Sequence, residues 1–130
     1  MANSKEHGDR NRLLSQKLFD EADYFDWSIT VAFYSAIHFV ENRLFPCIIN
    51  EQHCKNINDV KFAYKMDGRH ASRERLVFDR LREIGPYYKW LDDKSRYARY
   101  TTFKINKNEA EKAIQYLNKI YKYCYPDIND

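Results

Sequence analysis

Apolar side chains recur every three or four residues along most of this 130-residue chain, and only three glycines and three prolines are present to interrupt them. This period is typical of amphipathic helices, whereas an all-β sandwich needs a turn about every ten residues and therefore more Gly and Pro. The length suits one domain with one hydrophobic core. We therefore expect a single all-α domain over residues 1–130, built as an up-and-down bundle of four or five helices.

The first two helices are expected over residues 5–22 and 24–45. Asn3 or Ser4 caps the first helix, and Pro46 ends the second. The expected buried stripe of the first helix comprises Leu14, Leu18, Ala22 and Phe25. The second helix is apolar on two sides, so we expect it to lie at the centre of the bundle. Its first stripe comprises Ile29, Phe33, Ala36, Val40 and Leu44, and its second comprises Trp27, Tyr34, His38, Glu41 and Phe45. The second stripe could instead meet a partner chain.

Residues 46–68 form an irregular connection with room for one short helix near residues 60–64. A connection of this length is often functional or mobile. A third helix is expected to begin near Arg69, with Asp67 as a possible cap. The pair Gly85-Pro86 is expected to end it, because Gly followed by Pro often terminates a helix.

Two further helices complete the expected bundle. The fourth covers residues 87–100, and the last follows Asn106 and Glu109, which resemble a capping box. The inward face of the fourth comprises Tyr88, Leu91, Ser95 and Arg99. That of the last comprises Ala110, Ala113, Ile114, Leu117, Ile120, Tyr121 and Cys124.

Positive charge is concentrated in one third of the chain. The formal net charge is +3, and residues 61–104 contain 12 Lys/Arg and 6 Asp/Glu, a balance of +6 that leaves −3 for the rest. A basic segment of this kind permits contact with phosphates. A solvated helix face is the alternative interpretation.

The three cysteines, Cys47, Cys54 and Cys124, are expected to be free thiols. Their odd number and the polar N-terminus, which lacks an apolar signal segment, favour a cytoplasmic protein. The seven-residue spacing of Cys47 and Cys54 does not suit a zinc site, so we expect no metal and no other cofactor. No apolar run approaches the ~18 residues of a membrane span, so no membrane partner is expected.

His38 is the first candidate catalytic residue. Glu41 follows three residues later on the same helix, so the carboxylate can contact the imidazole and raise its pKa, which suits general acid–base chemistry. Alternatively, the two residues form a buried polar pair that bonds to a neighbouring helix.

His70 and Arg73 are the second candidate catalytic pair, with Arg99 as a further member. His70 and Arg73 lie in the first turn of the helix expected to begin near Arg69, on the same side as its apolar face. An arginine there meets the unfavourable end of the helix dipole and needs an anion nearby. That anion could be Glu41, another carboxylate or a ligand phosphate.

A run of interleaved arginines and tyrosines is the candidate nucleic-acid-binding segment. Its members are Arg96, Tyr97, Arg99 and Tyr100. Guanidinium groups bind phosphates in a bidentate manner, and tyrosine rings can stack on bases. Alternatively, the tyrosines pack in the bundle and the arginines pair with Asp92 and Asp93. No Gly-rich phosphate loop and no Gly-x-Ser-x-Gly motif is present.

Several blocks of residues together resemble one family. They are residues 26–29 with 32–38, His70-Ala71-Ser72-Arg73, and residues 95–100. In this order, within residues 19–117, they resemble an uncharacterised bacterial branch of the HEPN-domain superfamily. The resemblance implies a helical bundle that forms homodimers and binds RNA or a nucleotide. Many members are metal-independent ribonucleases of toxin–antitoxin and phage-defence systems, which implies an antitoxin or nucleotidyltransferase-like protein as a further partner.

The chain departs from the active members of that superfamily, which carry a His a few residues after an Arg. Here Arg43 precedes His53 by ten residues and Arg69 directly precedes His70, so neither pair fits. The resemblance therefore implies a divergent or non-catalytic RNA- or nucleotide-binding homodimer. One alternative is a metal-independent endoribonuclease whose site assembles through tertiary contacts. Its residues would be His38, His70, Arg73 and Arg99. Another alternative is a structural protein-interaction module that uses the second stripe of the central helix.

Overall fold

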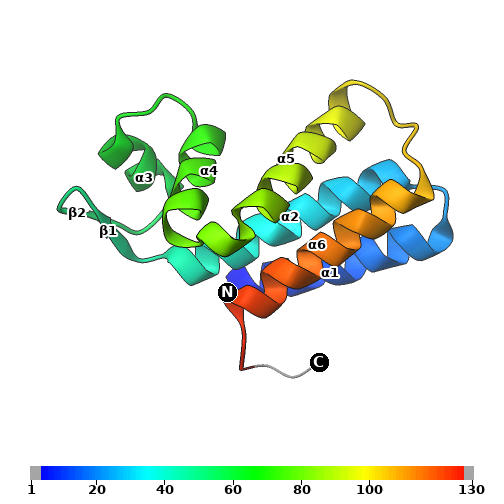
Figure 1. Cartoon of the computed structure of the whole chain (residues 1–130), viewed down its shortest axis with the longest axis horizontal. Helices are drawn as coiled ribbons and strands as arrows, with labels where there is room; N and C mark the ends of the chain where they lie inside the picture. The colour runs from blue at the N-terminus through cyan, green and yellow to red at the C-terminus, as the bar shows by residue number, and fades with distance from the viewer. Residues whose placement is uncertain (1–3, 128–130) are drawn as a thin grey trace.

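The computed structural model describes residues 4–127 and is mostly helical, with one small hairpin (Figure 1). The helices in this part of the chain are α1 (Ser4–Glu21), α2 (Phe25–Leu44), α3 (Ile57–Tyr64), α4 (Arg69–Arg80), α5 (Gly85–Tyr100) and α6 (Lys107–Cys124). The remaining elements are the strands β1 (Cys47–Ile49) and β2 (Gln52–Cys54) and the 3-10 turn η1 (Arg82–Ile84). The predicted helical class is confirmed, although the described residues form one helix more than the expected maximum of five.

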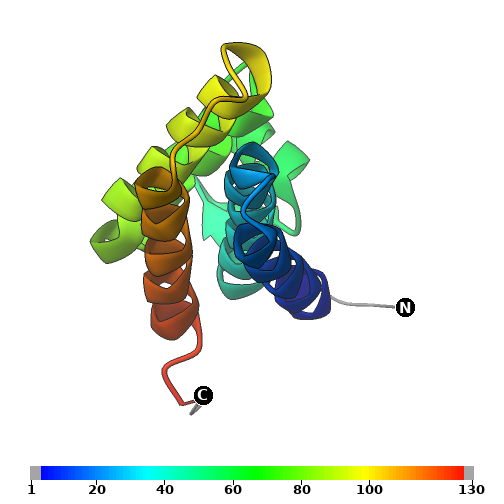
Figure 2. The same ribbon diagram turned by 90° about the vertical axis from the view of Figure 1, so that its right-hand side faces the viewer.

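Helix α2 lies at the centre of the molecule, as predicted, and contacts α1, α5 and α6. In chain order, α1, α2, α5 and α6 run alternately in opposite directions (Figure 1). Figure 2 looks along these helices, with α1 and α6 next to each other and α5 above them. The first stripe of α2 is buried along its whole length: Ile29, Phe33, Ala36, Val40 and Leu44. This stripe supplies the middle of the hydrophobic core.

The leucine stripe predicted for α1 is wrong. Leu14 is exposed, Leu18 and Phe25 are only half-buried, and Ala22 lies beyond the last residue of the helix. The buried residues of α1 are instead small. Such a packing surface is difficult to recognise in a sequence, because Gly8 and Ser15 are not hydrophobic, whereas the apolar Leu14 of the same helix faces solvent. Of the two caps proposed for this helix, Ser4 is its first residue, and Asn3 lies outside the described residues.

Glycine and serine form the contact between α1 and α2. The Ser15 hydroxyl donates to the Ser28 carbonyl at 2.8 Å, and the Ser28 hydroxyl donates to the Ser15 carbonyl at 2.8 Å. The Ser35 hydroxyl donates to the Gly8 carbonyl at 2.7 Å. A Cβ at Gly8 would lie 2.5 Å from the ring of Phe39. The two helices therefore approach closely only because these positions lack large side chains.

The connection at residues 46–68, expected to be irregular, is ordered into a hairpin and a helix. Asn50 and Glu51 have φ angles of 50° and 66°, as a two-residue type I′ turn requires. The Asn50 side-chain amide donates to the Ala63 carbonyl at 3.1 Å, which attaches the hairpin to α3. Helix α3 begins three residues before the expected start, because the Asn56 side chain caps it.

Gly85-Pro86 starts a helix instead of ending one. Helix α4 ends at Arg80, and Pro86 occupies the first turn of α5, where its missing N–H has no intrahelical partner to lose. Gly85 has no Cβ to clash with the Phe78 ring, which would lie 2.6 Å away. The predicted cap at Asp67 is also wrong, because the N-cap position falls on the next residue and carries no side-chain cap. From this corner α4 and α5 diverge (Figure 1).

Helix α6 matches its prediction closely. Its expected stripe is buried apart from Ile114, which is half-buried. The capping box is present: the Glu109 backbone N–H donates to Asn106 Oδ1 at 2.8 Å, and the Asn106 N–H donates to Glu109 Oε1 at 3.3 Å. Glu109 also pairs with Lys94, which joins the start of α6 to α5.

Candidate functional site

Side chains of the second stripe of α2 meet three helices. Glu41 contacts α4, and Trp27 and Tyr34 lie at the end of α5. His38 contacts α1. Arg73 in the first turns of α4 donates from Nε to Glu41 Oε2 of α2 at 2.7 Å. The Arg73 side chain is 10% exposed, so this is a largely buried ion pair. The prediction that Arg73 needs an anion is confirmed, and Glu41 is that anion. Because a protein carboxylate already occupies Arg73, its main role is to join α4 to α2.

His38 lies one turn before Glu41 and stacks on His7 of α1, with ring centroids 5.1 Å apart and planes at 20°. Burial lowers the pKa of His38, and the positive charges of His7 and Arg73 lower it further. Glu41 acts in the opposite direction but does not outweigh them. Glu41 thus raises the His38 pKa, as expected, but the net direction is downward because burial has the larger effect.

His70, in the first turn of α4, is exposed and lies in a strongly charged neighbourhood. Partial burial lowers the pKa of His70, Asp92 raises it, and the charges of Arg73, Arg96 and Arg99 lower it. The net direction is downward. The charges of Arg73 and Arg99 both act on the His70 pKa, and Arg73 also acts on the His38 pKa.

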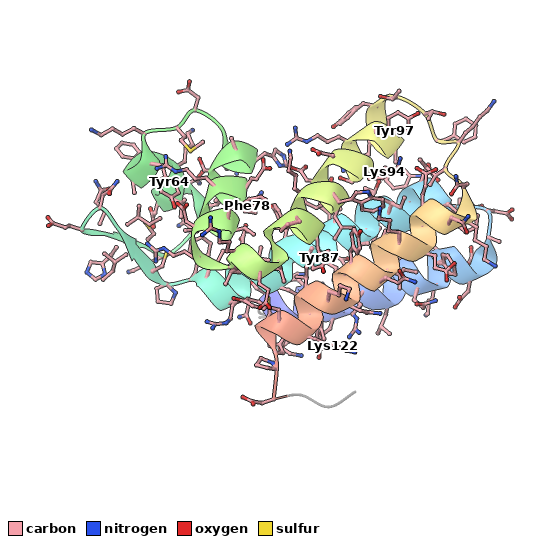
Figure 3. The ribbon with its side chains drawn as sticks, viewed as in Figure 1. Tyr64, Phe78, Tyr87, Lys94, Tyr97 and Lys122 are labelled. Carbon is pink, nitrogen blue, oxygen red and sulfur yellow. The ribbon has the colours of Figure 1, made fainter. Side chains whose placement is uncertain are left out.

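The arginine–tyrosine segment on α5 divides into two kinds of side chain. Arg96 is paired: Nε and Nη2 donate to Asp92 Oδ1 and Oδ2 at 3.0 and 3.3 Å. For Arg96 this matches the alternative interpretation, in which the arginines of this segment pair with Asp92 and Asp93 of the same helix. Burial raises the pKa of the Asp92 carboxyl, and the Arg96 charge offsets part of that rise. Tyr97 and Tyr100 are exposed, and Figure 3 shows Tyr97 near the outer end of α5.

Arg99 differs from Arg73 and Arg96 in having no acceptor. Its Nε and Nη1 atoms are buried and have no hydrogen-bond partner in the described part of the chain. Its guanidinium lies 5.6 Å from the ring centroid of Tyr34 and 5.3 Å from that of Tyr100. A buried donor without a partner carries a penalty of about 1–3 kcal/mol. A ligand that brings acceptor atoms would remove that penalty.

Tyr88, predicted only as a core residue, is a second incompletely satisfied group. Its side chain is fully buried, and its hydroxyl makes no hydrogen bond of good geometry within residues 4–127. Burial raises its pKa, as do the charges of Asp92 and Glu41, whereas the nearby Arg73 guanidinium lowers it through its charge and its N–H groups. The one sequence signal for a buried hydroxyl here was the presence of a tyrosine, Tyr88, on the expected inward face of the helix.

A cavity of about 480 Å³ lies beside Arg99, between the first turn of α2 and the end of α5. Asp26, Trp27 and Phe103 are among its lining residues. Sequence reasoning placed Trp27 on the second stripe but did not single out Asp26 or Phe103. An aromatic residue in the turn that follows α5 was the available signal for the latter.

Comparisons with protein-family models, curated proteins and solved structures find no match to this chain. Over residues 4–127, no group of three or more His, Cys, Asp or Glu is placed to hold a metal ion. A search of the same residues for a long apolar helix able to cross a membrane finds none.

Proposed function

We propose that this chain binds single-stranded RNA across the surface formed by the start of α4 and the outer half of α5, as a divergent, non-catalytic HEPN-like protein. The RNA-contacting residues are His70, Arg96, Tyr97, Arg99 and Tyr100. The observation that carries the proposal is the Arg99 guanidinium, whose buried Nε and Nη1 atoms have no acceptor among residues 4–127. Phosphodiester and base oxygens are acceptors that an RNA strand supplies in quantity.

The surroundings of Arg99 suit a flexible strand. Arg96 and His70 add positive or protonatable groups beside it, and the exposed rings of Tyr97 and Tyr100 offer faces for stacking. Each stacked base contributes about 1–3 kcal/mol to single-strand binding. A duplex hides its base faces, so these tyrosines favour a single strand over a duplex.

The proposal is tested by fluorescence anisotropy with a labelled, unstructured RNA of about 20 nucleotides at two salt concentrations. Wild type should bind more weakly at higher salt, because binding releases counterions from phosphates. The variant Arg96→Ala with Arg99→Ala should lose at least about tenfold in affinity. The control, Lys119→Ala with Lys122→Ala, removes the same charge from α6 and should change affinity far less. Equal affinity of the arginine variant and wild type, or an equal loss in both variants, would overturn the proposal.

We further propose that the chain forms a homodimer in the cytoplasm, and the exposed part of the second stripe of α2 supports the dimer. Trp27 and Tyr34 are both exposed on α2. A second copy of this chain would cover the Tyr34 ring, and an antitoxin or nucleotidyltransferase-like protein is the other partner that the HEPN resemblance implies. Light scattering should give a dimer for wild type and a monomer for Tyr34→Glu. A monomer in both cases removes the homodimer from the proposal.

A metal-independent endoribonuclease is the second candidate function, because His70 is an exposed imidazole of lowered pKa next to Arg73 and Arg99. The neutral imidazole could take the proton of a ribose 2′-hydroxyl, and Arg99 could stabilise the charged transition state. Incubation of RNA with EDTA present should then give cleavage products with wild type and none with His70→Ala. Equal products from both proteins exclude this function.

A further inference from the structure

The cavity beside Arg99 has the size and the lining of a base-binding pocket. It lies where α2 begins and α5 ends, at the right-hand end of the molecule in Figure 1. Its volume of about 480 Å³ falls within the range of small-ligand pockets. It opens at the end of the proposed RNA surface, so a strand that runs along α5 reaches it directly.

Three aromatic side chains at this cavity are unusually exposed. Trp27 is 53% exposed, Tyr100 80% and Phe103 71%. They come from two separate segments, the first turn of α2 and the end of α5 with the turn after it. Large apolar groups gathered in one exposed place mark an interaction site more often than single scattered ones do. A planar ligand between them would bury apolar faces that water now covers.

Two opposite charges line the same cavity without neutralising each other. Asp26 and Arg99 both contribute to it, and neither carboxylate nor guanidinium has a hydrogen bond or ion pair with another described side chain. The Thr30 hydroxyl donates at 2.9 Å to the Asp26 backbone carbonyl, so it does not use the carboxylate. The lining of the pocket therefore includes one carboxylate and one guanidinium beside aromatic rings, and a ligand reaches the buried Nε and Nη1 atoms of Arg99 when that side chain shifts.

We propose that this cavity binds a guanine base, an assignment that rests on the RNA-binding function above. The guanine N1–H and N2 amino group are adjacent donors, which a carboxylate such as Asp26 accepts together. The guanine O6 and N7 atoms are adjacent acceptors, and arginine is the side chain that most often donates to both.

Other bases match this pair of charges less well. Adenine presents an amino donor at position 6, where Arg99 also brings donors, and it has no N1–H for Asp26. Uracil offers Asp26 one donor where guanine offers two, and cytosine offers the carboxylate only its amino group. A mismatched base leaves Asp26 or Arg99 unpaired in the pocket, and bidentate contacts of this kind discriminate by about tenfold or more.

Tryptophan fluorescence tests the pocket directly. In a Trp90→Phe background, Trp27 is the one remaining tryptophan, so its quenching reports on the cavity. The probes are GMP, AMP, UMP and CMP, and single-stranded A-rich RNAs with or without one guanosine. GMP should quench at about tenfold lower concentration than AMP, and the guanosine should strengthen RNA binding.

Asp26→Asn separates base recognition from folding. The asparagine carbonyl can still accept from guanine N1–H, but its NH2 group would face the guanine N2 amino group, and both are donors. The GMP preference should therefore disappear. Xanthosine monophosphate carries a carbonyl at that place, so the variant should bind it better than wild type does. Asp23→Asn, which changes a carboxylate outside the cavity, should leave the GMP preference intact.

The outcomes distinguish this inference from the function on which it rests. If RNA binding depends on Arg96 and Arg99 but shows no preference for guanine in either protein, the pocket assignment fails and the RNA-binding function stands. If GMP binds selectively but RNA does not bind, the pocket stands and the wider RNA surface fails. Equal quenching by all four mononucleotides overturns the guanine assignment outright.

Discussion

The two sides of α2 are built on opposite principles. Toward α1, the contact is close and closed: the hydroxyls of Ser15, Ser28 and Ser35 all donate to carbonyls of the neighbouring helix. Toward α4 and α5, the contact is open: Arg99 and Tyr88 bury polar atoms that have no hydrogen-bond partner among the described residues. Exposed aromatic rings lie at the outer end of this second side.

This difference separates a structural interface from a binding surface. Hydrogen bonds completed within the protein leave no donor or acceptor for a ligand, so these serine contacts stabilise the fold. Buried donors without acceptors carry an energetic penalty that only a ligand or water can remove. The comparison predicts that substitutions on the α1 side change stability, whereas Arg99 and Asp26 affect ligand binding. Four stability measurements test it.

The largest effect is expected for Arg73→Met, which removes the most buried ion-paired arginine of the open side. Glu41 would lose its counterion in a largely buried position, and the unfolding free energy should fall by about 3 kcal/mol in urea denaturation. The double variant with Glu41→Leu removes both charges and should recover most of that loss. If the unfolding free energy of Arg73→Met falls by less than about 1 kcal/mol, the Arg73–Glu41 ion pair contributes no more to stability than an exposed surface pair does.

Gly8→Ala is the next test, on the closed side. In most helices this change stabilises by about 1 kcal/mol, because alanine favours the helix. Here the new methyl group would meet the buried Phe39 ring, so we expect a net loss of about 2 kcal/mol in the same assay. Gly68→Ala, at the extended N-cap position of α4, controls for an added methyl group without a clash, since nothing lies within 4 Å of its added Cβ. A gain of stability in Gly8→Ala would contradict the close contact between α1 and α2.

A matched pair of hydroxyl deletions compares the two sides directly. Ser28→Ala removes a satisfied hydrogen bond and should lower the unfolding free energy by about 1 kcal/mol. Tyr88→Phe removes a hydroxyl that has no partner and should leave stability unchanged or raise it by up to about 1 kcal/mol. If Tyr88→Phe is the more destabilising change, the Tyr88 hydroxyl has a partner and the open side is less open than described.

The smallest effect is expected from protonation of His38, where the two sides meet. Burial and the neighbouring charges lower its pKa in the folded protein below the ordinary value of 6.5. As pH falls through 6.5, the unfolded chain binds a proton on His38 before the folded protein does. The neutral form of His38 therefore favours the folded state above this pH, and that contribution to stability is lost as the pH falls further. Unfolding at pH about 7.5 and about 5.5 should therefore show a smaller pH dependence in His38→Gln than in wild type. An equal pH dependence in both proteins would mean that His38 titrates alike folded and unfolded.

Local patterns predicted the helices whose packing face is large and apolar. The α2 core stripe and the α6 stripe with its capping box were correct, because periodicity and capping depend on residues within one or two turns. The α1 face was not predictable in this way, since Gly8 and Ser15 have no hydrophobic signal. Gly85-Pro86 was misassigned because Pro suits a helix start as well as the position after a helix end.

The sequence by itself determined that this chain is helical, that α2 is central, and that Arg73 needs an anion. Each of these follows from the spacing of residues along one helix. Only the tertiary structure decided that Glu41, 32 residues away, is that anion, and that Arg99 is left without one. The physical reason is that partners across a bundle depend on which helices meet and at what angle. The Gly85 corner sets that arrangement for α4 and α5.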